Sequence, residues 1–256
     1  MRKNSTVSYP LTELHCHLLP GIDDGASSPE VSMQMLQMER EQGVQQILFT
    51  PHFYLHRTPL DVFLERRLDS AYQIKDALKE SGMLCRFGAE VRMEDGLLNM
   101  DLRPLTMGKT DYLLLEWPMH SIFPLWGEEL VDHIFDQGLT PVFAHIERFD
   151  WFWDDADYLE EFVDQGVISQ VNAGTILDPV TQKKALRLIE DGLVHVIASD
   201  AHGVDHRVPN LGEAMKVIEK KLGSRKAAEL SENANRIFHN QEMEEKSSGF
   251  SLFRRK

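Results

Sequence analysis

Residues 28–52 read SPEVSMQMLQMEREQGVQQILFTPH and contain one helix followed by one strand. Ser28 can cap the helix with Pro29 at its first position, and Gly43 can end it in the left-handed conformation. Residues 44–50 then form a run rich in branched and aromatic side chains, which is typical of a strand. A helix that leads directly into a strand is the repeating unit of parallel α/β folds.

The same unit recurs along the whole chain. Further β-type runs, most of them nearly continuous in apolar residues, occupy 11–15, 84–90, 111–116, 140–145, 167–172 and 194–199. Such runs indicate strands that are covered on both faces and pair in parallel. Helix stops precede strands at Gly43, Gly82, Gly138, Gly166 and Gly192, and Asp178-Pro179 resembles a second helix start. Seven strands with six crossovers predict a distorted, TIM-like (β/α)7 barrel, with an open doubly wound sheet as the competing architecture.

Size and composition favour one domain. The chain has 256 residues, of which 42% are hydrophobic, and we expect a barrel domain over 10–240 between a flexible leader, 1–9, and a polar, then basic, disordered tail, 241–256. No signal peptide or membrane span is recognisable, and two cysteines fit a reducing compartment, so we expect a cytoplasmic protein. The net charge of -14 argues against a broad nucleic-acid surface but leaves room for a local basic pocket.

Side chains that can bind metals follow six of the seven predicted strands. They are His15, His17, His52, Glu90, Glu116, His145, Asp200 and His202. The carboxyl ends of barrel strands converge on one face, where active sites form. His15 and His17 point to the same side of an extended strand, with Cys16 on the opposite side. Histidine together with carboxylates suits zinc, manganese or iron, so the sequence predicts a metal site.

Seven segments in order resemble one protein family. They are LHCHLLPGIDDGA (14–26), FTPHF (49–53), FGAEV (87–91), LLLEWP (113–118), FAHIERF (143–149), QVNAG (170–174) and ASDAH (198–202). Together they resemble the polymerase and histidinol phosphatase (PHP) superfamily, whose members have a seven-stranded α/β barrel and three metal ions. Within it, the chain is most similar to the manganese-dependent bacterial protein tyrosine phosphatases of capsule and exopolysaccharide clusters, the CpsB/CapC/YwqE type.

The resemblance implies a distribution of ligands. One metal ion would be held by His15, His17, Glu90 and Asp200, a second by Glu90, Glu116 and His145, and a third by Asp24, His52 and His202. Many superfamily members have histidine in place of Asp24 and Glu116, so these two residues point to the tyrosine phosphatase branch. Asp23 is the alternative to Asp24 and could instead brace the loop.

Two arginines are candidates for phosphate binding. Arg148 matches a phosphate-binding arginine of the family, and its alternative role is a surface salt bridge. Arg207 could be a second anion contact, although it follows His202 at a shorter spacing than in relatives. The candidate aromatic rim consists of Tyr54, His56, Trp117 and Phe149, each of which could equally be a packing residue.

The expected activity is hydrolysis of phosphotyrosine on a protein, with an autophosphorylating tyrosine kinase of polysaccharide export as the partner. Two or three divalent ions, manganese or else iron or zinc, would supply a hydroxide that attacks phosphorus without a covalent phosphoenzyme. Neither Cys16 nor Cys85 begins a C-x5-R phosphate loop, which disfavours a cysteine nucleophile. The alternatives are a small-molecule phosphatase acting on a compound such as histidinol phosphate, a nuclease, and a non-catalytic metal-binding module.

Overall fold

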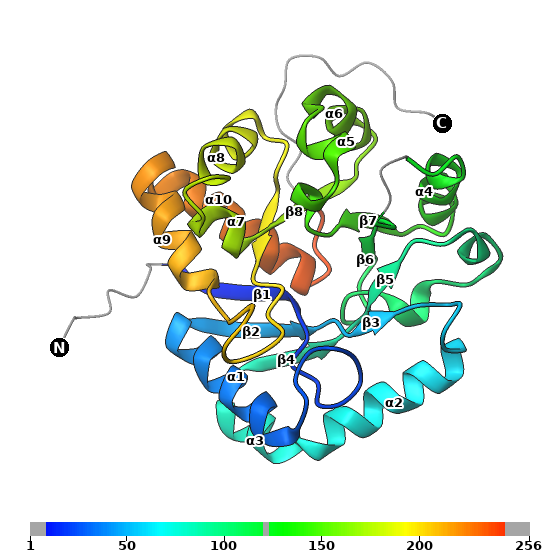
Figure 1. Ribbon diagram of the computed structural model, residues 1–256, viewed down its shortest axis with the longest axis vertical. Helices are drawn as coiled ribbons and strands as arrows, with labels where there is room; N and C mark the ends of the chain where they lie inside the picture. The colour runs from blue at the N-terminus through cyan, green and yellow to red at the C-terminus, as the bar shows by residue number, and fades with distance from the viewer. Residues whose placement is uncertain (1–8, 120–122, 244–256) are drawn as a thin grey trace.

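The computed structural model describes residues 9–119 and 123–243. Within these ranges the strands all pair in parallel and helices surround them (Figure 1). The strands are β1 (Leu11–Cys16), β2 (Val44–Phe49), β3 (His52–Phe53), β4 (Leu84–Phe87), β5 (Glu90–Arg92), β6 (Tyr112–Glu116), β7 (Thr140–Phe143), β8 (Ile168–Asn172) and β9 (Val196–Ala198). They form a curled parallel sheet in two parts, ordered β1-β2-β4 and β3-β5-β6-β7-β8-β9. The α/β class and the parallel pairing are therefore confirmed.

One of the predicted strands is broken rather than continuous. The run 84–90 becomes β4 and β5, separated at Gly88, where an added Cβ would lie 3.1 Å from the Met107 Cα and from the Thr106 carbonyl oxygen. The run 44–50 is confirmed as β2, and the short strand β3, which was not predicted, follows it after Pro51, whose nitrogen carries no hydrogen for a sheet ladder. The other five runs are confirmed to within two residues at each end.

Helices fill the connections between strands. They are α1 (Pro29–Gln42), α2 (Leu60–Gln73), α3 (Lys75–Ser81), α4 (Gly127–Asp136), α5 (Asp150–Trp153), α6 (Ala156–Asp164), α7 (Ala173–Leu177), α8 (Gln182–Asp191), α9 (Leu211–Leu222) and α10 (Ser224–Phe238), with short 3-10 turns η1 (Asp95–Asn99), η2 (Arg103–Leu105) and η3 (Ile146–Arg148). Among the described residues, no helix is both long enough and apolar enough to cross a membrane.

The predicted helix ends are mostly confirmed. The Ser28 side chain accepts a hydrogen bond from the Val31 N–H at 3.4 Å, and Gly43 ends α1 with a φ of 95°. The five predicted glycine stops all have positive φ. The predicted start at Asp178-Pro179 is wrong: α8 begins only at Gln182, and Asp178 follows α7, where its carboxylate accepts from the Val180 N–H.

The apolar core has two parts. An inner core contains Leu48, Leu114, Val142, Ile168, Val196 and side chains from the end of α10, and the larger outer core lies between the strands and the helices. Because side chains alternate along a strand, Glu116 and Gln170 lie on the same face as Leu114 and Ile168 but two residues nearer the carboxyl ends. The inner face thus changes from apolar to polar toward the carboxyl ends, and this change positions the site. Most of the predicted leader, 1–9, and tail, 241–256, lies outside the described residues.

Candidate metal centre

The structure brings all nine predicted ligands to the carboxyl ends of the strands. His15 and His17 come from the end of β1 and Glu116 from the end of β6. His52 and Glu90 are the first residues of β3 and β5 and lie just beyond the carboxyl ends of β2 and β4. The other four, Asp24, His145, Asp200 and His202, follow strands. Eight of these side chains are at most 10% exposed, and Asp24, at 68%, is the exception. A cluster of buried histidines and carboxylates therefore lies where the resemblance implies metals.

Glu90 lies at the centre of the cluster. Its Oε2 is 3.2 Å from His15 Nε2, 3.2 Å from His17 Nε2 and 2.9 Å from His52 Nδ1. Its Oε1 is 2.7 Å from His145 Nε2. One carboxylate therefore faces four imidazoles through both of its oxygens, which is the arrangement a bridging ligand requires.

The first predicted group is compact. Ligand atoms of His15, His17, Glu90 and Asp200 all lie within 4.8 Å of one another. Asp200 Oδ1 is 3.3 Å from His15 Nε2 and 3.4 Å from His17 Nε2. These four side chains could hold one metal ion.

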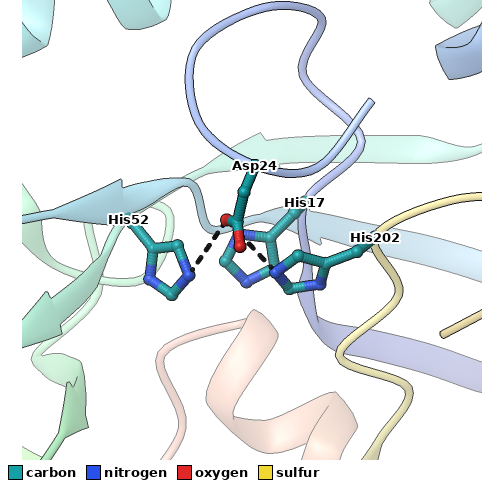
Figure 2. Close-up of side chains that lie close together, drawn as sticks. All are labelled: His17, Asp24, His52 and His202. Carbon is teal, nitrogen blue, oxygen red and sulfur yellow. Dashed lines mark ion pairs between the residues drawn. The ribbon is translucent and has the colours of Figure 1, made fainter. Parts of the chain in front are cut away.

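The third predicted group is also brought together, with one addition. Figure 2 shows Asp24 extending from its loop toward His17, His52 and His202. Asp24 Oδ1 is 3.4 Å from His52 Nε2 and 3.5 Å from His202 Nε2, and His17 belongs to the same group of mutually close ligand atoms. Four side chains could therefore hold a second ion here.

The remaining predicted group differs in one member. Mutually close ligand atoms belong to His52, Glu90 and Glu116, whereas the family resemblance implied His145 beside the two glutamates. His145 Nε2 nonetheless lies 2.7 Å from Glu90 Oε1 and 3.7 Å from Glu116 Oε1. Both histidines border the space between the two carboxylates.

The donor atoms fit divalent metal ions. Glu90 Oε2, Glu116 Oε2, Asp200 Oδ1 and His202 Nε2 are buried, and none of them has a partner in hydrogen-bonding geometry among the described residues, although histidine nitrogens lie near the first and third of these atoms. Buried polar atoms are normally hydrogen-bonded, and leaving several unpartnered in one place is costly unless a cation coordinates them. Nitrogen and carboxylate donors in this combination suit manganese, iron or zinc.

Local charges hold the ligands in different protonation states. Burial opposes ionisation of Glu90 and Asp200, but His15 and other neighbouring histidines outweigh it and keep both pKa values well below the usual range. Burial, followed by repulsion from Glu90, raises the pKa of Glu116 to about 7. Burial and the nearby His17 lower the pKa of His202 to about 3, so this imidazole is neutral and offers a lone pair.

Both candidate phosphate-binding arginines reach the cluster. Arg148 Nη2 donates to Asp200 Oδ2 at 2.6 Å, and Arg207 Nη2 donates to the same oxygen. Their side chains are 29% and 38% exposed, so each also faces outward. Arg148 therefore contacts a buried candidate metal ligand, which distinguishes this ion pair from the surface salt bridge considered as its alternative role.

The backbone is strained at the same place. Five described residues other than glycine have positive φ, and three of them, His145, Asp200 and Arg207, belong to the candidate site. Left-handed backbone at such residues is unfavourable and persists where the surrounding structure imposes it. The sequence did not predict this strain.

Asp23 braces the loop, whereas its neighbour Asp24 faces the histidines. Asp23 Oδ2 lies 2.8 Å from His17 Nδ1 and accepts from the His52 N–H at 3.0 Å. Burial disfavours its charge, but His17 and the hydrogen bonds outweigh this and lower the pKa of Asp23. Of the two roles left open from the sequence, the structure places Asp23 in the bracing one.

Arg92 is a site residue that the sequence reasoning missed. It follows Glu90 by two residues on β5, so strand alternation alone places it on the same face. Its guanidinium carbon is 5.6 Å from the centre of the Tyr54 ring, and its positive charge opposes the rise in the pKa of Glu116. Arg92 thus adds positive charge beside the cluster.

Only part of the predicted aromatic rim is accessible. Tyr54 stacks on His52 with ring centres 5.1 Å apart, and Arg57 lies 4.6 Å above the Tyr54 ring. His56 is exposed and its Nδ1 lies 2.7 Å from Glu94 Oε1. Trp117 and Phe149 are wrong as rim residues, because both are buried in the outer core, with exposed fractions of 0% and 2%.

Neither cysteine has the character of a nucleophile. Cys16 is buried on the outer side of β1, where its Sγ donates to the Leu48 carbonyl at 3.4 Å. Burial raises the pKa of Cys16 well above its usual value and that of Cys85 to about 11. The predicted orientation of Cys16 away from the site is consistent with this packing.

Comparisons with known proteins agree with one another. A family model described as "Capsular polysaccharide synthesis, CpsB/CapC" matches residues 11–239. The chain is 33% identical to tyrosine-protein phosphatase YwqE of Bacillus subtilis (strain 168), over 90% of this chain and 92% of that protein. It is 32% identical to tyrosine-protein phosphatase CpsB of Streptococcus pneumoniae, over 86% and 94%. A solved structure described as that of YwqE from Bacillus subtilis and CpsB from Streptococcus pneumoniae, unique metal-dependent tyrosine phosphatases, superposes with a TM-score of 0.81 at 28% identity, over 91% of this chain and 96% of that chain.

Proposed function

The chain belongs to the CpsB/CapC family of capsular polysaccharide synthesis proteins, and we propose that it is a metal-dependent protein tyrosine phosphatase. The observation that carries this proposal is the convergence of buried histidines and carboxylates, beside which Arg148 and Arg207 both contact one oxygen of Asp200. A metal cluster with two outward-facing arginines suits a substrate that is a phosphate group.

We assign two or three divalent ions, with manganese as the native metal, to the cluster. His15, His17, Glu90 and Asp200 would hold one, and Asp24, His52 and His202 with His17 would hold another. Glu116, together with Glu90 and either His52 or His145, would complete the third. Such ions lower the pKa of coordinated water to about 7 and neutralise charge on a phosphoryl group.

The protein's own groups would bind and orient the substrate. Arg148 and Arg207 would turn their guanidinium groups from Asp200 to the phosphate oxygens, where a planar fork can hold two oxygens at once. Tyr54, stacked on His52 and contacted by Arg57 and Arg92, would lie beside the phenol ring of the substrate. A phenol leaves with a pKa of about 10, so departure demands less of a general acid than an alkyl alcohol would.

We infer that the curled sheet is a distorted seven-stranded barrel. In this interpretation β2 with β3 and β4 with β5 are each one interrupted strand. Closure between β1 and β9 is supported by the isolated parallel bridge of Cys16 with Ala201 and by the Asp200 N–H, which donates to the His15 carbonyl at 2.8 Å. A closed barrel would hold ligands from the first and last strands in one fixed geometry.

For the physiological substrate we propose a phosphorylated tyrosine in an exposed segment of a bacterial tyrosine kinase of polysaccharide export. The names of the relatives support the reaction, and the family description supports the setting. We place the enzyme in the cytoplasm, where Cys16 and Cys85, both free thiols, would stay reduced.

The decisive experiment compares substrates and metals on one preparation of the full chain. We expect a higher kcat/KM for a phosphotyrosine peptide than for histidinol phosphate, loss of activity with a chelator, and recovery with manganese. A better rate on histidinol phosphate would replace the tyrosine phosphatase by a small-molecule phosphatase. Full activity in a sample shown to be free of metal would overturn the metal mechanism.

A further inference from the structure

β8 differs from the other strands that border the site. None of the nine candidate ligands follows it, and its carboxyl end instead carries two amides, Gln170 and Asn172. They lie two residues apart on the face that Ile168 turns to the inner core, and Gln170 is only 1% exposed. Two buried or half-buried amides at this position need hydrogen-bond partners, and the partners are groups of the metal centre.

Gln170 contacts the segments of two histidine ligands. Its Oε1 accepts from the His145 N–H at 2.9 Å and lies 3.1 Å from His15 Nδ1. A backbone N–H can only donate, so the amide atom that faces both groups is the oxygen. His15 Nδ1 must then carry a proton, which leaves the lone pair of a neutral ring on Nε2, 3.2 Å from Glu90 and 3.3 Å from Asp200.

Asn172 continues the chain of hydrogen bonds to Asp200. Its Oδ1 accepts from Gln170 Nε2 at 2.8 Å, and its Nδ2 donates to Asp200 Oδ2 at 2.9 Å. The Asn172 N–H donates to Glu147 Oε1 at 3.1 Å, which fixes this end of β8. With Oδ2 engaged, Asp200 presents its unpartnered Oδ1 to His15 and His17.

We propose that Gln170 and Asn172 are positioning residues that fix the tautomer of His15 and the orientation of Asp200, and so set the affinity of the His15–His17–Glu90–Asp200 group for its metal ion. The inference rests on the proposed metal-dependent function. Partners that hold the second nitrogen of a metal-binding histidine change metal affinity by about 10- to 100-fold when removed. The same contacts explain why a strand without a ligand of its own still ends in polar residues on its inner face.

The first test removes the acceptor without changing the side-chain length. In Gln170→Met we expect the tightest manganese site, measured by titration calorimetry on chelator-treated full-length protein, to weaken by about 10- to 100-fold. Gln46→Met is the matched control, because Gln46 is also buried on a strand and also donates to an asparagine, Asn235, at 2.8 Å, but contacts no candidate ligand. The manganese affinity of Gln46→Met should stay within about twofold of wild type, even if its melting temperature falls as much as that of Gln170→Met.

The second test reads the tautomer directly. Nitrogen NMR of the metal-free protein, at a pH at which the His15 ring is neutral, should show a proton on Nδ1 of His15 in wild type and in Gln170→Glu, whose carboxylate keeps the acceptor. In Gln170→Met that signal should be lost or exchange-broadened. Because the glutamate variant keeps both the side-chain size and the acceptor, loss of the Nδ1 proton in this variant would overturn the inference even if the methionine variant fails to fold.

The outcomes separate this inference from the function on which it rests. If wild type binds no metal, the proposed function fails and this inference fails with it. If wild type binds metal and hydrolyses phosphotyrosine while Gln170→Met matches Gln46→Met in manganese affinity, the positioning role alone is overturned. An unchanged His15 tautomer in Gln170→Met has the same consequence.

Discussion

Arg148→Ala should lower kcat/KM on a phosphotyrosine peptide without removing metal. Arg148 Nη2 lies 2.6 Å from Asp200 Oδ2, and its side chain is 29% exposed, so the guanidinium can turn to a phosphate at the mouth of the site. A hydrogen bond to a charged group contributes about 1.5 to 3 kcal/mol. Since about 1.36 kcal/mol corresponds to tenfold in rate, the expected loss is about 10- to 150-fold.

Metal binding should survive this substitution because Asp200 Oδ2 keeps two other donors, Asn172 Nδ2 and Arg207 Nη2. The control is Arg187→Ala, which breaks a surface pair with Asp191 whose side chains are 81% and 52% exposed. Such a pair is worth little, so activity and melting temperature should hardly change. Steady-state kinetics, metal content and thermal unfolding on each variant complete the assay. If Arg148→Ala stays within twofold of wild type, or loses activity only as far as it loses manganese or stability, the phosphate-binding role is refuted.

Four further expectations concern the same site. Cys16→Ser and Cys85→Ser should each retain phosphatase activity within about twofold, and a large loss with fold and metal intact would argue for thiol chemistry. Glu116, whose pKa burial raises to about 7, must lose a proton before it binds metal, so manganese affinity should rise with pH up to about 7 and Glu116→Gln should flatten this slope in calorimetric titrations. The same raised pKa means that the metal-free protein should lose stability as the pH rises from 4.5 to about 7 in denaturant titrations, because the unfolded chain gives up this proton first. Tyr54→Leu should reduce kcat/KM for aryl phosphates more than for histidinol phosphate, with the exposed Tyr72→Leu, at 67% exposure, as the control that should change neither.

The positions of the ligands could be predicted from the sequence because two simple regularities coincide. Strand alternation puts His15 and His17 on one side of β1, and the carboxyl ends of parallel strands meet at one edge. Neither regularity depends on side-chain packing, so both hold even though one predicted strand is broken at Gly88 and a short strand, β3, was not predicted. The assignment of Asp24 rather than Asp23 came from the resemblance alone.

The incorrect rim residue Trp117 and the missed roles of Gln170 and Asn172 have different causes. Trp117 follows Glu116 directly, so alternation turns it away from the site, and it packs against Phe143 and Phe152 in the outer core. The rim was predicted from aromatic residue type, and strand alternation was not applied to Trp117. The roles of Gln170 and Asn172 could not be predicted, because their partners lie 25 to 155 residues away and an amide has no preferred chemistry until its neighbours are known.

The charge of the molecule and the charge of the site favour the same class of substrate. The chain carries a net charge of -14, which disfavours a polyanion because each phosphate would need its own Lys or Arg. At the mouth, however, Arg57 and Arg92 flank Tyr54, while Arg148 and Arg207 meet at Asp200. Positive charge gathered at one point on an acidic surface can bind a single phosphate group and still repel a long phosphodiester. This distribution favours a phosphate monoester on a protein side chain over a nucleic acid, independently of any likeness to known phosphatases.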